Sequence, residues 1–137
     1  MTDHVDKIKR SAIMAAVGSR DTGPELKLRK MLHALGYRYR LHDARLPGRP
    51  DLVFAYRQKV IFVNGCFWHR HEGCRYATTP KTRVGFWKAK FEANKTRDVR
   101  NVKELKRLGW QVAVVWQCQL KSPKAAVSRI VKFLERE

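Results

Sequence analysis

The residues of this chain that could bind a metal gather around a short loop that follows an apolar run at positions 60–63. The candidate ligands are soft ones, three cysteines and a histidine: Cys66, His71, Cys74 and Cys118. Three thiolates and an imidazole leave no position for water, which indicates a structural tetrahedral zinc rather than a catalytic one. The alternative is three buried cysteines beside a solvated histidine. The chain has 3 cysteines, and an odd number favours metal ligation in a reducing compartment over a disulfide framework.

A second set of side chains suits the hydrolysis of a phosphodiester. Asp51 opens an apolar run, where a carboxylate is costly unless it is paired or binds a cation. We expect it to bind Mg²⁺, with the carbonyl oxygen of Val63 as a second ligand. His69 is the expected general base, because an imidazole titrates closest to neutral pH. Glu25 is expected to reach the ion through water, although its position three residues after Thr22 also fits a helix cap.

The charge of the chain predicts its partner. Thirty Lys and Arg against twelve Asp and Glu give a formal net charge of +18, so nucleic acid is the expected ligand. Apolar Phe67 and Trp68 follow Cys66, where a solvated loop would carry small polar residues, and this favours a wedge that enters the partner. No apolar run approaches the roughly 20 residues of a membrane-spanning helix. We therefore expect a cytoplasmic, nucleoid-associated protein with no membrane partner.

The hydrophobic pattern predicts the framework that positions these residues. The expected fold class is α/β, a mixed central sheet flanked by helices, in a single domain spanning residues 1–137. Apolar side chains at helical spacing and strongly apolar or alternating runs mark the elements. The predicted helices cover residues 1–20, 22–35, 85–108 and 123–135, and the predicted strands cover residues 37–41, 52–55, 59–63 and 110–116.

Residues 1–20 are predicted to form a DNA-contacting helical arm. Their apolar positions make a single helical stripe, and Met14 lies off that stripe, where it can touch a partner. The basic residues expected to contact DNA here are Lys7, Arg10 and Arg20. The alternative is an ordinary solvated helix.

Several motifs, taken in this order, resemble the very-short-patch-repair (Vsr) DNA mismatch endonucleases. They are Leu-Pro-Gly-Arg-Pro-Asp at 46–51, Gly-Cys-Phe-Trp-His at 65–69, Phe-Trp at 86–87 and the run 108–116 followed by Cys118. The resemblance extends over nearly the whole chain, from about Lys7 to Cys118. It implies a restriction-endonuclease-like fold with a structural zinc site. It also implies Mg²⁺-dependent nicking of double-stranded DNA 5′ to the T of a T:G mismatch, which arises when 5-methylcytosine deaminates.

The resemblance also implies residue roles. They are Asp51 as a Mg²⁺ ligand, His69 as general base, Glu25 in indirect support, and Cys66, His71, Cys74 and Cys118 on zinc. Phe67, Trp68 and Trp87 would form a wedge beside the mismatch, with Met14 gripping from the other groove and Arg49 as a further DNA contact. A wedge favours mismatches, because a poorly stacked base step costs less to pry apart. The alternative places Phe67 and Trp68 in the core under the zinc.

Two departures from the family pattern stand out. Asn64 occupies a position where members of the family carry histidine, and the spacing from His71 to Cys74 is one residue longer, with Gly73 available to form a bulge. Without the resemblance, the residues leave open a nuclease and a zinc-stabilised DNA-binding module without catalysis. A restriction-type or homing-type nuclease on the same fold is a further alternative. We expect a monomer, since the site is complete within one chain, and a mismatch-repair protein is a candidate partner.

Overall fold

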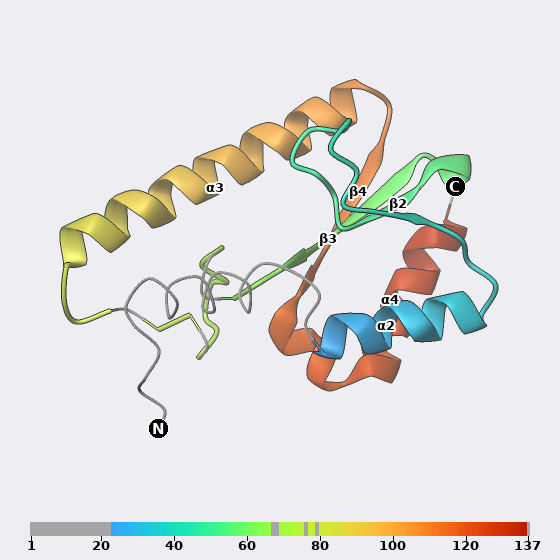
Figure 1. The fold of residues 1–137 in the computed structure, drawn as a ribbon, viewed down its shortest axis with the longest axis horizontal. Coiled ribbons are helices and arrows are strands. Elements are labelled where there is room, and N and C mark those ends of the chain that lie inside the picture. Colours follow the sequence, from blue (N-terminus) through green and yellow to red (C-terminus); the bar gives the residue numbers. More distant parts are fainter. Residues whose placement is uncertain (1–22, 67–68, 76, 79, 137) are drawn as a thin grey trace, which may run out of the picture.

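The computed structural model describes residues 23–66, 69–75, 77–78 and 80–136. Within these ranges, three α-helices surround a four-stranded sheet (Figure 1). The helices are α2 (Gly23–Ala34), α3 (Val84–Arg107) and α4 (Pro123–Glu135), with short 3₁₀ helices η2 (Ala55–Arg57) and η3 (Gln117–Lys121). The strands are β1 (Arg40–Leu41), β2 (Leu52–Phe54), β3 (Lys59–Asn64) and β4 (Gln111–Trp116). The mixed α/β architecture is therefore confirmed, whereas the predicted helix at 1–20 lies outside the described residues.

The sheet has the strand order β1-β2-β3-β4. β2 and β3 form the predicted antiparallel hairpin, with Leu52 opposite Ile61. β3 and β4 run parallel, and their last residues, Asn64 and Trp116, lie opposite each other. Because parallel strands end at the same edge, the loop after β3 and the turn after β4 begin side by side. This pairing brings two segments far apart in sequence to one place.

Both faces of the sheet are covered, because alternate residues of β2 and β3 point to opposite sides. On one face, α2 and α4 pack together, and the buried cluster includes Leu32, Phe54, Ile61 and Ile130. The other face carries a smaller cluster beneath the C-terminal end of α3, made of Val53, Val60 and Leu105. The two strands that carry the candidate site are thus held from both sides, which gives the site a rigid base.

Helix α3 differs from an ordinary covering helix. It spans 24 residues, and its buried residues are Phe91 and Leu105, while Phe86, Val99 and Leu108 are 48%, 55% and 47% exposed. The reason is its placement, since much of the helix extends beyond the sheet (Figure 1). Many basic side chains prevent α3 from being a membrane span, and no helix among the described residues is long and apolar enough to be one.

The predicted strand at 37–41 shortens to the two residues of β1, which pair with Leu52 and Val53. The tyrosines before it pack on the core instead of extending the ladder. Ring centroids of Tyr37 and Tyr39 lie 6.3 and 5.6 Å from that of Phe54. Aromatic burial against the core has therefore taken the place of strand pairing at these two residues.

Candidate active site and metal centre

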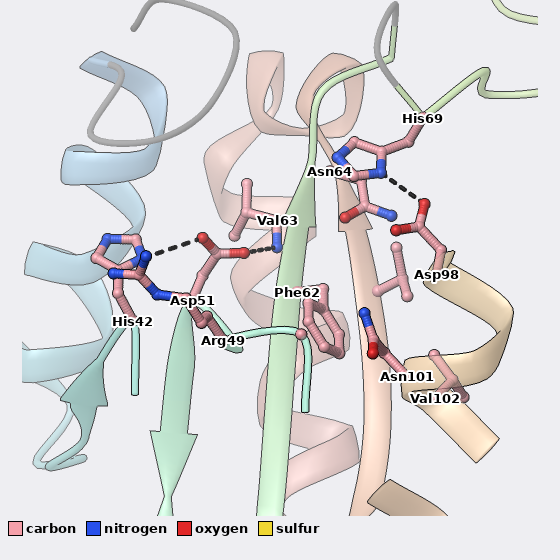
Figure 2. Close-up of a pocket in the computed structure, with 12 residues that line it drawn as sticks. His42, Arg49, Asp51, Phe62, Val63, Asn64, His69, Asp98, Asn101 and Val102 are labelled. Atoms are coloured by element: carbon pink, nitrogen blue, oxygen red, sulfur yellow. Dashed lines mark hydrogen bonds and ion pairs between the residues drawn. The ribbon is translucent and has the colours of Figure 1, made fainter. Parts of the chain in front are cut away.

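A pocket of about 360 Å³ opens beside the carboxyl end of β3 (Figure 2). It is lined by residues of β3, β4, α3 and the loops before β2 and after β3. The lining residues are His42, Gly48, Arg49, Asp51, Phe62, Val63, Asn64, His69, Asp98, Asn101, Val102 and Val114. Gly48 is required at its position, because its φ is +78° and an added Cβ would lie 3.0 Å from the side chain of Asn101. The loop carrying Asp51 is thereby packed closely against α3.

Asp51 is the buried carboxylate of the pocket, 8% exposed. Its Oδ2 accepts a 2.6 Å hydrogen bond from the backbone N–H of Val63, and its Oδ1 lies 3.4 Å from Nδ1 of His42. Burial raises the pKa of Asp51 to about 6, against the opposing effect of the Val63 hydrogen bond. A cation in the pocket would favour the charged form. The structure brings Asp51 and the backbone of Val63 together through this hydrogen bond, and their role as ion ligands stays a prediction.

His69 and Asp98 form a hydrogen-bonded pair at the opposite side of the pocket (Figure 2). The distance from His69 Nδ1 to Asp98 Oδ2 is 2.6 Å. A carboxylate accepts only, so the ring proton lies on Nδ1 and Nε2 is the basic nitrogen. Asn64 lines the pocket beside this pair. His69 was predicted from the sequence, whereas Asp98 was not. In the sequence Asp98 stands out only as an acidic residue among the basic side chains of α3.

Glu25 enters the site indirectly. Its side chain is 2% exposed and its Oε2 accepts a 2.7 Å bond from Nη2 of Arg29, one turn further along α2. The same Nη2 lies 3.2 Å from Nε2 of His42. The structure therefore places Glu25 within reach of Asp51 through two intervening side chains. Neither Arg29 nor His42 was predicted from the sequence. Arg29 follows Glu25 by four residues, a spacing that brings opposite charges together on a helix, whereas no sequence pattern indicates a role for His42.

The predicted soft ligands form one cluster. The ligand atoms of Cys66, His71, Cys74 and Cys118 all lie within 4.8 Å of one another. Nδ1 of His71 is 3.4 Å from Sγ of Cys118, and the backbone N–H of Cys118 donates to Sγ of Cys66 at 3.4 Å. Tetrahedral zinc at about 2.3 Å from each sulfur needs ligand atoms about this close. The donor set therefore fits a metal ion, and the predicted grouping of these residues is confirmed.

The surroundings of the cluster support ligation. Burial raises the pKa of the Cys66 thiol to about 12, and a bound cation would lower that pKa by favouring the thiolate. The ring of His71 stacks on Trp116 with centroids 4.2 Å apart, which fixes the orientation of the imidazole. Gly73 has a φ of +72°, a left-handed conformation that glycine adopts without strain. Gly73 lies in the turn in which the N–H of Cys74 donates to the carbonyl oxygen of His71 at 3.2 Å, and the longer spacing relative to the family stays a prediction.

The predicted DNA contacts are described only in part. Phe67 and Trp68 lie outside the described residues, and so does the basic arm with its four named contacts, Lys7, Arg10, Met14 and Arg20. Trp87 is half-buried near the start of α3, and its ring lies 5.7 Å from Phe91 and 5.3 Å from Phe86. Arg49 is exposed at the pocket. Their contacts with DNA stay predictions.

Sequence comparison places the chain in a class of hydrolases, the DNA endonucleases. The chain belongs to the Vsr family, since the sequence model described as "DNA mismatch endonuclease Vsr" matches residues 2–75. The family prediction is thereby confirmed, and the binding module without catalysis loses its support.

Three curated relatives, each named as a type II nicking enzyme or a DNA mismatch endonuclease, match this chain over most of their length. The type II nicking enzyme V.XorIIP of Xanthomonas oryzae pv. oryzae is 47% identical over 135 residues, 98% of each chain. The type II nicking enzyme V.NmeAIP of Neisseria meningitidis is 40% identical, covering 98% of this chain and 95% of the relative. The DNA mismatch endonuclease Vsr of Escherichia coli K12 is 45% identical, covering 88% of this chain and 77% of the relative.

Proposed function

We propose that this protein is a Mg²⁺-dependent endonuclease that nicks double-stranded DNA 5′ to the T of a T:G mismatch. The observation that carries the proposal is a single pocket with buried Asp51 on one side and the His69–Asp98 pair on the other. Relatives named as nicking enzymes and as a mismatch endonuclease support a cut in one strand. The nick would begin very short patch repair of deaminated 5-methylcytosine.

Asp51 and the carbonyl oxygen of Val63 would hold the ion. Mg²⁺ bound there would supply positive charge to stabilise the phosphate oxygens in the transition state. Nε2 of His69 would accept the proton of a water molecule as the water oxygen bonds to phosphorus. One ester P–O bond then breaks, and the leaving oxygen takes up a proton from solvent. Asp98 holds the imidazole in orientation and stabilises its charged form through Nδ1. These roles divide the pocket into an ion-binding side and a proton-accepting side.

The Cys₃His cluster would hold a structural zinc ion that ties the loop after β3 to the turn after β4. Phe67, Trp68 and Trp87 would form the wedge that enters the DNA beside the mismatch. The arm at residues 1–20, including Lys7, Arg10, Met14 and Arg20, would grip the duplex together with Arg49. The fold would be restriction-endonuclease-like, and the enzyme a single-domain cytoplasmic monomer.

Replacing Asp98 with asparagine is expected to slow nicking by about 100-fold, because the imidazolium loses its charged partner. His69→Ala should cost at least as much, and the double variant should be no slower than His69→Ala, since Asp98 acts through His69. Single-turnover nicking of a T:G duplex measures these rates. Glu104→Gln, which removes a carboxylate of the same helix outside the pocket, should stay within about threefold of wild type. If the rate losses of Asp98→Asn and His69→Ala multiply in the double variant, the two residues do not act as a pair.

A further inference from the structure

Three buried polar side chains and the half-buried His42 form a line from helix α2 to the candidate ion ligand. Arg29 Nη2 lies 2.7 Å from Glu25 Oε2 and 3.2 Å from His42 Nε2. His42 Nδ1 in turn lies 3.4 Å from Asp51 Oδ1. The side chains of Glu25 and Arg29 are 2% and 10% exposed, and those of His42 and Asp51 are 15% and 12% exposed. Polar groups with so little access to water need protein partners, and these contacts supply some of them.

The chemistry of Arg29 determines the proton position on His42. A guanidinium nitrogen only donates hydrogen bonds, so Nε2 of His42, which faces it, must accept. The proton of the imidazole therefore lies on Nδ1, the nitrogen that faces Asp51. Glu25 holds Arg29 in place through the ion pair. The order Glu25, Arg29, His42 thus ends in a ring nitrogen that carries the proton and lies 3.4 Å from one carboxylate oxygen of Asp51.

The backbone holds His42 in this arrangement as well. His42 follows β1 with a φ of +47°, a left-handed conformation that is uncommon outside glycine and tends to mark positions under structural constraint. Its own N–H donates to the carbonyl oxygen of Asp51 at 3.2 Å. The second carboxylate oxygen of Asp51 accepts from Val63. One carboxylate oxygen of Asp51 therefore accepts a hydrogen bond, and the other lies beside the His42 imidazole.

We propose that Arg29 and His42 are positioning residues that hold the Asp51 carboxylate ready to bind a divalent cation. The inference rests on the proposed function in one respect, namely that Asp51 is the ion ligand. A carboxylate held by a hydrogen bond at one oxygen and an ion-pair contact at the other loses little freedom when the ion binds. Partners of ligating groups commonly change metal affinity when they are removed. Arg29 acts through His42, and His42 acts through Asp51.

The affinity of the protein for Mn²⁺ tests the positioning role of Arg29 and His42 without a measurement of DNA cleavage. Electron paramagnetic resonance can follow Mn²⁺ binding to zinc-loaded protein on an intact T:A duplex, with Asp51→Asn as the reference for a lost site. We expect His42→Ala to weaken binding about 10-fold. His42→Gln should stay within about threefold, because its amide can donate to Asp51 and accept from Arg29. His33→Ala, an exposed histidine of α2, is the matched control and should bind as wild type does.

A double-variant cycle tests whether Arg29 acts through His42. Arg29→Gln should weaken Mn²⁺ binding several-fold in the wild-type background and add nothing to His42→Ala, because Arg29 acts through His42. Wild-type Mn²⁺ affinity in His42→Ala would overturn the inference, and so would an additive effect of Arg29→Gln. The proposed function fails separately: Mn²⁺ binding that depends on His42, in a protein that nicks no T:G duplex, would refute mismatch nicking and leave the positioning role intact.

Discussion

Replacing Asp51 with asparagine is expected to slow strand nicking by about 10³-fold while DNA binding stays within about threefold of wild type. Asparagine has nearly the same shape and keeps an oxygen that can accept from the N–H of Val63. It lacks the negative charge that a divalent ion requires, so the ion and its transition-state stabilisation are lost together. DNA affinity is retained because lysine and arginine contacts with phosphates dominate it.

Single-turnover nicking at saturating protein separates these two effects, with DNA affinity measured by gel shift in the same buffer. The matched control is Glu135→Gln, which removes a carboxylate that bonds to Tyr37 and Arg57 on the surface. It should nick at nearly the wild-type rate. A decrease of less than about 10-fold in Asp51→Asn would mean that this carboxylate is not the main ion ligand.

Replacing Cys118 with serine should remove the bound zinc and lower the melting temperature by 10 °C or more, about the shift expected from the loss of a few kcal/mol. Cys118 lies in η3 after β4, whereas its partners Cys66, His71 and Cys74 lie in the loop after β3. Loss of one ligand therefore disconnects two segments that are far apart in the chain. Elemental analysis and thermal unfolding measure the two changes, and the wild type should hold about one zinc per chain.

Two histidine substitutions, one inside the cluster and one outside it, provide the matched control. His71→Asn should lose zinc and stability as Cys118→Ser does, because it removes another member of the cluster. His33→Asn changes an exposed histidine of α2 and should leave both properties unchanged. A zinc-free wild-type protein that melts normally and nicks DNA would show that the cluster has no structural metal.

Features with a strong local pattern could be predicted from the sequence. The hairpin of β2 and β3 follows from two apolar runs around a short turn, and α4 covers the predicted residues, Pro123–Glu135. The metal cluster was predictable because cysteine is scarce in this chain and three of the ligands, Cys66, His71 and Cys74, are near one another in sequence. Asp51 was conspicuous as a carboxylate at the start of an apolar run.

The remaining site residues had no local pattern of their own. Asp98 meets His69 because α3 crosses from β3 to β4, and His42 meets Asp51 because β1 pairs with β2. Contacts of this kind depend on the tertiary arrangement, which the hydrophobic spacing does not specify. The exposure of Phe86 and Val99 has the same origin, since helical spacing predicts an apolar face but not how far the sheet extends beneath it.

Strand-resolved nicking of two duplexes that differ in a single pair tests the central claim most directly. One duplex carries T:G and the other T:A, each strand is labelled separately, and Mg²⁺ is present with zinc-loaded protein. A wedge opens the weaker T:G step at lower cost, which brings the phosphate 5′ to the T towards Asp51 and His69. Phe67→Ala and Trp68→Ala should reduce the ratio of the nicking rates of the T:G and T:A duplexes. His69→Ala should lower both nicking rates and leave their ratio unchanged.

Several flanking sequences should be included, because base contacts beside the mismatch can limit which duplexes are bound. We expect one nick, in the T strand, immediately 5′ to the mismatched T. The T:A duplex should be cut much more slowly, and removal of Mg²⁺ should abolish cutting. Equal cutting of both duplexes, or breaks in both strands, would contradict this expectation and indicate a restriction-type or homing-type nuclease.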